Sequence, residues 1–282
     1  MPAQIQIVNP SFNIQAPGIY SESAQLFIEA GPMGISLAIL NTGDCFQAAV
    51  VYSFPNKMTE QHVQEELQEI LSNEPLLKKQ YRKVHIIWCF PESILVPPEL
   101  MNEENRNEML NLVFGDARKN SDKQDFLYKH NLHNIYRIPA AISESFAAQL
   151  PYATQSHQYS LLANRVLNGG NELYAVFYTN SLTTILCKEG KLQVIQNFPF
   201  NTPEDTSYQL LNVCRSFEVD PASVKLCISG MVDKRSNLYA DIYKYFLHIE
   251  FDNLPGGFTC VEEIKAHPPH FFSHLFYEAL CV

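Results

Sequence analysis

The residues best suited to chemistry by type and spacing are three histidines near the end of the chain. His267, His270 and His274 lie close together, and the last two have the i, i+4 spacing with which a helix can hold a metal ion. Cys281 follows two turns later, but the segment has no HExxH motif. We therefore interpret it as an aromatic helix with partly exposed histidines and predict no metal site.

The pattern does not indicate a nucleophile or a phosphate loop of a common type. The chain has neither a GxSxG elbow nor a Walker glycine loop. Ser229 precedes Gly230 where a strand is expected to end, so we interpret it as a turn serine. His85 lies in an apolar run and is interpreted as a core histidine whose hydrogen bonds are satisfied.

The cysteines and the hydrophobic runs indicate the cellular compartment of the protein. There are seven cysteines, an odd number without a CxxC pair, and most lie in apolar runs, which is typical of reduced core thiols. The first ten residues lack the basic and long apolar regions of a signal peptide. No stretch approaches the roughly 18 apolar residues of a membrane span. We predict a cytoplasmic location without membrane insertion.

Composition and net charge limit the classes of molecule that the protein is expected to bind. The 282 residues are 46% hydrophobic and 18% charged, which is enough for a substantial core. Lys and Arg number 20 against 30 Asp and Glu, and the net charge of −10 argues against nucleic acid and anionic membranes. A local basic run is interpreted as a solvated helix end, with contact to an acidic partner as the alternative: Lys78, Lys79, Arg82 and Lys83.

The expected secondary structure repeats once along the chain. The first half gives a three-strand meander, a helix and a doubly buried strand at residues 26–54, 59–71 and 84–90. The second half gives the same order at residues 172–200, 202–217 and 223–230. Thr59 and Thr202 are the expected N-caps, and Pro203 takes the first helical position. The offset of about 140 to 147 residues predicts an internal duplication.

Further helices and two polar joints complete the expected organisation. The helices are predicted at residues 101–114 and 143–150, from Ser236 through NLYADIYKYFL, and after Pro269. A polar loop is expected at residues 115–123, and the NGGN sequence at 168–171 separates the halves. We predict a first lobe of residues 1–167, with a segment inserted at about 92–150, and a second lobe of residues 168–282.

This order of elements resembles the duplicated ribonuclease-H-like core of the actin, sugar-kinase and heat-shock-ATPase superfamily. The second half is similar to the second lobe of its pilus-assembly and cell-division branch. The chain also resembles an uncharacterised Bacteroidetes family of this superfamily, the domain of unknown function 3822. The matching features are NFPFNTPEDTSYQLL, LCISG, SNLYADIYKY and the aromatic C-terminal helix. The resemblance implies an α/β, two-lobed actin-like fold with mixed sheets flanked by helices, and no established activity.

The resemblance also implies where a nucleotide would bind. Enzymes of the superfamily hold ATP between the lobes with one Asp-x-Gly turn from each lobe. The first-lobe turn here is Glu29-Ala30-Gly31-Pro32, in which Glu29 replaces the aspartate and Pro32 removes a backbone N–H. The second-lobe turn, residues 178–181, is Tyr-Thr-Asn-Ser, which is bulky and uncharged.

A third element is retained in part. Gly230 ends a strand where the superfamily has a pair of glycines for the adenosine, and Met231 replaces the second glycine. Glu29, Gly31 and Gly230 are therefore the candidates for a divergent nucleotide site, and the competing interpretation makes them ordinary strand-end turns. Because a site needs its binding groups placed together, we favour the second interpretation. We expect no catalytic residue, no metal and no cofactor.

The leading hypothesis is a non-catalytic actin-like protein that acts as an adaptor or assembly factor through protein contacts or self-association. One alternative is a divergent phosphotransferase or ATPase that uses ATP and Mg²⁺, and another is a small-molecule sensor that uses the interlobe cleft. Aromatic residues exceed what one small lobe needs, so some are expected to form a protein-binding surface. The relevant residues are Phe258, Phe271, Phe272, Phe276, Tyr277, Tyr239, Tyr243, Tyr245 and Phe246.

Overall fold

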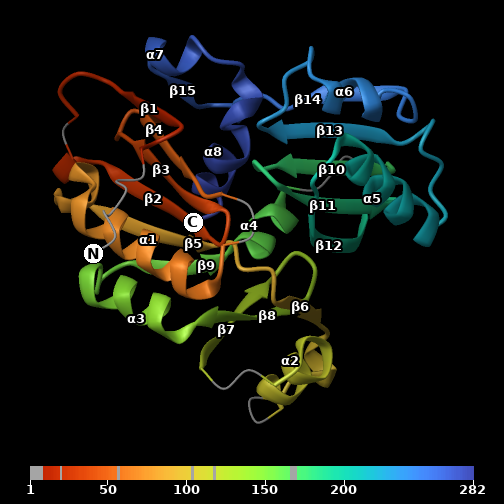
Figure 1. The fold of residues 1–282 in the computed structure, drawn as a ribbon, viewed down its shortest axis with the longest axis horizontal. Coiled ribbons are helices and arrows are strands. Elements are labelled where there is room, and N and C mark those ends of the chain that lie inside the picture. Colours follow the sequence, from red (N-terminus) through yellow and green to blue (C-terminus); the bar gives the residue numbers. More distant parts are fainter. Residues whose placement is uncertain (1–8, 20, 56–57, 103–104, 117–118, 166–169) are drawn as a thin grey trace, which may run out of the picture.

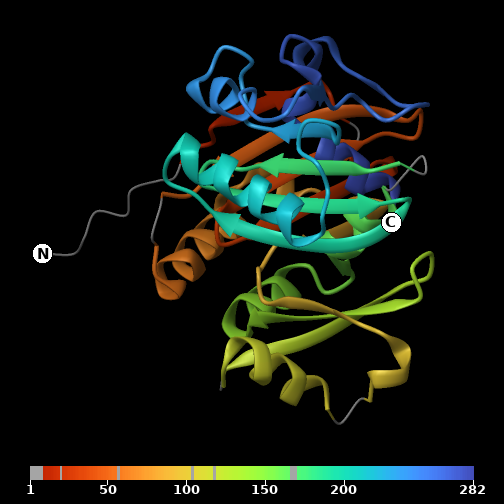
Figure 2. The same ribbon diagram turned by 90° about the vertical axis from the view of Figure 1, so that its right-hand side faces the viewer.

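Two mixed β-sheets lie side by side, and a smaller third sheet lies below them (Figure 1). The computed structural model describes residues 9–19, 21–55, 58–102, 105–116, 119–165 and 170–282. A view turned by 90° shows the third sheet and its helix standing apart from the other two sheets (Figure 2).

The first sheet has the order β1-β4-β3-β2-β5-β9, and a short strand, β15, also pairs with β4. The strands are β1 (Phe12–Gln15), β2 (Gln25–Gly31), β3 (Gly34–Leu40), β4 (Cys45–Ser53), β5 (Lys83–Trp88), β9 (Thr154–His157) and β15 (Thr259–Cys260). β2, β3 and β4 form the expected antiparallel meander, while β5 joins β2 in parallel.

The second sheet has the order β12-β11-β10-β13-β14. Its strands are β10 (Glu172–Phe177), β11 (Ser181–Lys188), β12 (Lys191–Pro199), β13 (Lys225–Gly230) and β14 (His248–Phe251). Again three strands form an antiparallel meander, and β13 joins β10 in parallel. The expected duplication is confirmed, because β5 and β13 hold the same central position between two parallel neighbours.

In each half of the chain, a capped amphipathic helix follows the meander and packs on the sheet. In α1 (Glu60–Asn73) the Thr59 side chain accepts from a backbone N–H of the first turn, and in α5 (Pro203–Ser216) Thr202 and Asp205 form a capping box. The apolar stripe of α1 packs over the first sheet, where Trp88 is fully buried. The stripe of α5 packs over the second, where Ile228 is fully buried.

The third sheet is formed within the first half of the chain. It has the order β6-β8-β7, with β6 (Ser93–Val96), β7 (Asn120–Leu127) and β8 (Leu132–Pro139). α2 (Arg106–Phe114) ends before Gly115 as expected but starts later than residue 101, because residues 98–100 form a 3-10 turn. The polar loop predicted to run to residue 123 is shorter, since β7 already starts at Asn120. α3 (Ala140–Gln149) and α4 (Gln158–Asn164) lead to the second sheet.

The end of the chain returns from the second sheet to the first. α6 (Asn237–Ile242) is shorter than the sequence predicted, and after β14 the chain adds β15 to the edge of β4. α7 (Glu262–Lys265) and α8 (Ser273–Leu280) follow, and α8 packs its aromatic residues on the first sheet. The boundary predicted between residues 167 and 168 lies outside the described residues and stays a prediction. Of the residues described, none belongs to a helix long and apolar enough to cross a membrane.

Candidate functional site

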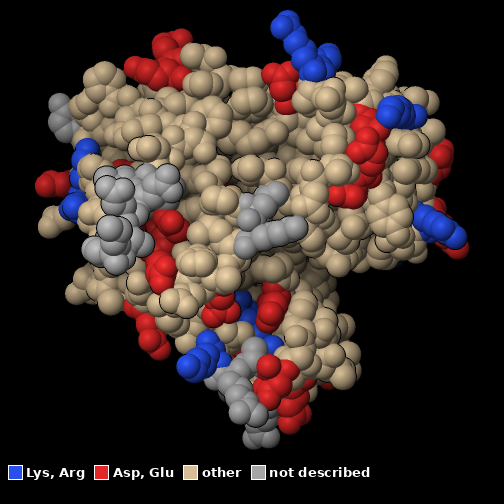
Figure 3. Space-filling model, in the orientation of Figure 1, with Lys and Arg blue, Asp and Glu red and all other residues tan. Residues whose placement is uncertain are grey.

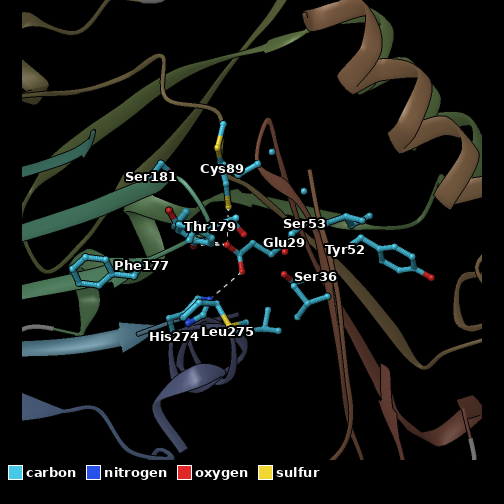
Figure 4. A pocket seen from close by; sticks show the side chains of 18 of the residues that line it. Glu29, Ser36, Tyr52, Ser53, Cys89, Phe177, Thr179, Ser181, His274 and Leu275 are labelled. Carbon is cyan, nitrogen blue, oxygen red and sulfur yellow. Dashed lines mark hydrogen bonds and ion pairs between the residues drawn. The ribbon is translucent and has the colours of Figure 1, made fainter. Parts of the chain in front are cut away.

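The two turns that the sequence assigned to a nucleotide lie opposite each other and enclose a small cavity (Figure 4). One turn follows β2 at Gly31, and the other follows β10 at Tyr178. The ends of β3 and β4, and residues of α4 and α8, complete the walls. The free space between them is about 50 Å³. Ligand pockets are usually about 300 Å³ or larger, so this space suits a few water molecules.

A direct hydrogen bond joins the two turns. The hydroxyl of Tyr178 donates to Oε1 of Glu29 over 2.5 Å; Glu29 is buried and Tyr178 is partly buried. Burial, followed by the neighbouring Glu29 charge, raises the pKa of Tyr178 well above its ordinary value, so the phenol keeps the proton that it donates. The Glu29 carboxyl group, which replaces the metal-binding aspartate of the superfamily, therefore accepts a hydrogen bond from the opposite sheet.

Two further side chains add donors to the same oxygen. Gln158, at the start of α4, donates from Nε2 to Glu29 Oε1 over 3.1 Å and also to the Tyr178 hydroxyl. Cys89, which follows β5, donates from Sγ to Glu29 Oε1 over 3.3 Å. Thr183 of β11 donates to Gln158 Oε1 over 3.3 Å and fixes the amide orientation. We call Glu29, Cys89, Gln158 and Tyr178 the interlobe latch.

The second oxygen of Glu29 faces α8. His274 Nε2 lies 3.7 Å from Glu29 Oε2, which is too long for a hydrogen bond. Burial lowers the pKa of His274 despite the nearby Glu29, so the imidazole is neutral and this contact is not an ion pair. Glu278, one turn later, is completely buried; its oxygens form no close hydrogen bond with a described residue, and the nearby Gln158 side chain only partly lowers its pKa.

The two acids of the cleft influence each other. Burial, and after it the charge of Glu29, raises the pKa of Glu278 well above its ordinary value. A proton on Glu278 removes the like-charge repulsion that two buried carboxylates would have. Sequence reasoning missed Glu278, although its i, i+4 spacing from His274 was an available signal for a shared helix face.

Two of the three C-terminal histidines are buried, which corrects the prediction that they are partly exposed, while His267 is partly exposed as predicted. His270 and His274 retain only 7% and 6% of their accessible surface. His270 Nε2 lies 2.8 Å from the carbonyl oxygen of Val232, and His274 Nδ1 lies 3.2 Å from Ser229 Oγ. The physical reason is that the aromatic helix is packed between the two sheets instead of on the surface.

Ser229 is also different from the turn serine that was predicted. It is fully buried, and its hydroxyl lies 2.7 Å from Ser273 Oγ and accepts from the backbone N–H of His274. Ser229, His274 and Glu29 have the residue types of a hydrolytic relay. The geometry does not form one, because a substrate has no access to the hydroxyl and the His–Glu step is too long. These contacts fasten α8 to β13.

His85 has one of the two partners expected for it. Its Nδ1 lies 2.6 Å from Thr154 Oγ1, while its buried Nε2 has no hydrogen-bond partner among the described residues. Desolvation is the main cause that lowers the pKa of His85 to about 3, so the ring is neutral and remains a core residue.

The three candidate residues are not brought together as a binding site. Gly31 and Gly230 each sit against backbone of their own sheet, where a Cβ would lie 2.9 Å from Cys89 Cβ and 2.1 Å from the Phe177 carbonyl oxygen. Glycine is therefore required for packing at both positions. Glu29 and Gly31 both line the cavity, whereas Gly230 is not among its described lining residues. Within the described residues, no group of three or more His, Cys, Asp and Glu side chains could hold a metal ion.

Two equivalent sheets with the topology described above, separated by a cleft and joined in one chain, define an actin-like fold. The chain belongs to the family "Protein of unknown function (DUF3822)", whose model matches residues 17–249. No curated protein matches the sequence.

Solved structures with this fold are similar over nearly the whole chain. One is a Bacteroides thetaiotaomicron protein with an actin-like ATPase fold and unknown function, at 18% identity and a TM-score of 0.74, covering 92% of this chain and 96% of the other. The PilM–PilN complex of type IV pilus biogenesis matches at 12% identity and 0.60, covering 94% and 99%. The cytoplasmic domain of Vibrio cholerae EpsL, an inner-membrane component of the type II secretion system, matches at 12% and 0.51, covering 92% and 96%.

Proposed function

We propose that this chain is a non-catalytic actin-like protein that works as an adaptor or assembly factor through protein contacts. The observation that carries the proposal is the hydrogen bond between Glu29 and Tyr178, which joins the two turns where the resemblance places phosphates. A nucleotide would have to break the latch and leave the partners of a buried carboxylate unsatisfied.

The remaining groups of the cleft offer little to offset that cost. Pro32 supplies no backbone N–H, and among the described residues that line the cavity there is no Lys or Arg. The protein carries a net charge of −10, an acid, Glu29, lines the cavity, and its charge also acts on a second buried acid, Glu278. Several phosphate charges would therefore be desolvated without compensating donors or cations.

Exposed aromatic and aliphatic residues of the second lobe support a role in protein contacts. The surface formed by α5 and the residues after α6 exposes Tyr208, Tyr243, Tyr245 and Leu247 by 65%, 57%, 43% and 62%. On the face shown in Figure 3 the described Lys and Arg side chains are scattered and form no continuous basic patch. The similar PilM and EpsL structures come from protein assemblies by their descriptions, which agrees with this role.

The enzymatic half of the proposal is tested by the thermal stability of the protein with Mg-ATP. We expect no change in the melting midpoint and no hydrolysis above background. A ligand present at about 100 times its Kd would add about 2.7 kcal/mol and move the midpoint by several degrees. A shift of that size in the wild type, lost in Glu29→Gln, would establish the alternative, a divergent ATP-binding enzyme.

The adaptor half is tested by affinity capture from the native cell followed by mass spectrometry. Tyr243→Ser with Tyr245→Ser should lose the captured partner, because these rings are exposed on the surface assigned to the contact. Tyr152→Ser is the matched control, since Tyr152 is 96% exposed and lies elsewhere, after α3. Equal capture by all three proteins would contradict this use of the surface.

A further inference from the structure

A second cavity, separate from the interlobe latch, lies on the other face of the second sheet. α5 and α6 cover one face of this sheet, and α4 covers only part of the opposite face. Between β10, β13, β14 and the helices α4 and α8 there remains a cavity of about 480 Å³. This volume lies in the range of cavities that hold small organic molecules.

The polar centre of this cavity is one arginine held in a fixed orientation. The guanidinium carbon of Arg165 lies 4.2 Å from the ring centre of Tyr174 and 4.7 Å from that of Tyr277, so aromatic rings contact the group from two elements. Asp252 pairs with Nη2 of the same group and also accepts from the Tyr174 hydroxyl over 3.0 Å. Both Asp252 and Tyr174 are buried.

The contacts leave part of the guanidinium available. Arginine carries five N–H donors, and within the described residues Arg165 uses its side chain in one hydrogen bond, to Asp252. Its side chain keeps 18% of its accessible surface and lines the cavity. A planar group with remaining donors and a fixed orientation matches the two oxygens of a carboxylate.

Among the described residues, the other charged side chains of the wall are one cation and two acids. Lys225 and Glu250 form an ion pair of 2.8 Å, and Glu172, the third acid of the wall, raises the pKa of Lys225 together with Glu250. The apolar part of the wall includes Ile185, Leu254 and Leu280, beside the rings of Tyr174 and Tyr277. Such a wall suits a compact hydrocarbon or aromatic body.

We propose that this cavity is a binding site for a small organic carboxylate with an apolar body, whose carboxylate is held by Arg165. The site goes beyond the adaptor function and does not depend on it. α8 carries Tyr277 into this cavity and Glu278 into the cleft beside the latch, so the two regions share one helix.

The test is calorimetric titration of the full chain with phenylacetate and hexanoate, and with phenylacetamide as the uncharged match. We expect saturable binding of at least one acid with a Kd below about 1 mM, and binding of its amide at least about tenfold weaker. Lack of binding by both acids at about 10 mM, or equal binding of the acid and the amide, would overturn the proposal.

Three variants locate the site. Arg165→Gln combined with Asp252→Asn removes the charge pair without leaving a buried acid unpaired, and should weaken acid binding at least about tenfold. Cys227→Leu fills the cavity from β13 and should weaken binding of acid and amide alike. Arg235→Gln, at an exposed arginine outside the cavity, should change nothing. Acid binding that survives the first two variants would contradict the assignment. These titrations contain no nucleotide, so their outcome is independent of the Mg-ATP experiment.

Discussion

At the scale of single residues, two acids, Glu29 and Glu278, are buried near the cleft, where few hydrogen-bond donors are available. Glu29 is satisfied on one oxygen by three donors from Cys89, Gln158 and Tyr178. For Glu278, burial outweighs the effect of its polar neighbour Gln158, so its neutral form is the one that the surroundings favour. The latch and the neutral Glu278 therefore form one arrangement. The Glu29 carboxyl group accepts three hydrogen bonds, and the neighbouring Glu278 carboxyl group carries no charge.

This arrangement makes the stability of the protein depend on pH. The pKa of Glu278 in the folded protein is raised well above its ordinary value of 4.5. The unfolded chain loses this proton first, so the stabilisation is complete below the unfolded pKa and is lost as the pH rises through the folded pKa. We expect the contribution of Glu278 to the free energy of unfolding to fall as the pH rises above the ordinary glutamate pKa.

Glu278→Gln isolates this effect, because an amide has nearly the shape of the protonated acid and does not titrate. Relative to wild type, the variant should be more stable at about pH 8 than at about pH 5 by more than about 1.4 kcal/mol, which corresponds to one pKa unit. The measurement is denaturant unfolding at both pH values. Glu263→Gln, at an exposed acid of α7, serves as the control. A pH-independent difference between Glu278→Gln and wild type would refute the assignment.

At the scale of elements, the ends of strands decide what the cleft can do. The sequence predicted both meanders, both N-caps and both central strands, because alternation, apolar runs and capping residues are local signals. It also placed a turn after β10, although Ser181 already belongs to β11, and a turn after β2, although Glu29 itself lies within β2. It could not show that Tyr178 reaches Glu29, since that contact depends on how closely two sheets approach. Gln158 and Glu278 join the site from helices whose packing is likewise non-local.

Gly230 tests the claim that glycine at this strand end serves packing. It has φ +87°, and an added Cβ would lie 2.1 Å from the carbonyl oxygen of Phe177. Gly257 has nearly the same φ, +88°, with no atom within 4 Å of the corresponding position. Gly257→Ala should therefore cost only the backbone strain, about 1–2 kcal/mol.

Gly230→Ala should cost that strain and a further 1–3 kcal/mol or more, roughly, because the clash is with backbone in the second sheet. Urea unfolding of the two variants gives the comparison, and the shared φ removes the backbone contribution from the difference. Equal destabilisation would show that β10 yields easily, and the packing explanation for Gly230 would then fail.

At the scale of the whole molecule, the two sheets are connected by the end of the chain. Phe276 of α8 stacks on Phe46 of β4 with ring centres 3.9 Å apart, and it belongs to the core cluster of the first sheet. Three residues earlier on the same helix, Ser273 contacts Ser229 of β13. The first sheet therefore lacks part of its core until the last helix has docked.

A substitution in α8 should for this reason destabilise strands near the beginning of the sequence. Phe276→Ala removes a fully buried aromatic ring and should lower the free energy of unfolding by about 3–5 kcal/mol. Hydrogen exchange should show the loss of protection in β3 and β4 of the first sheet. Phe246→Ala is the matched control, because Phe246 is equally buried in the core of the second sheet, and its loss should first expose β10 and β13. If Phe276→Ala loosened only the second sheet, residues 168–282 would form a self-contained lobe and α8 would not be the element that completes the first.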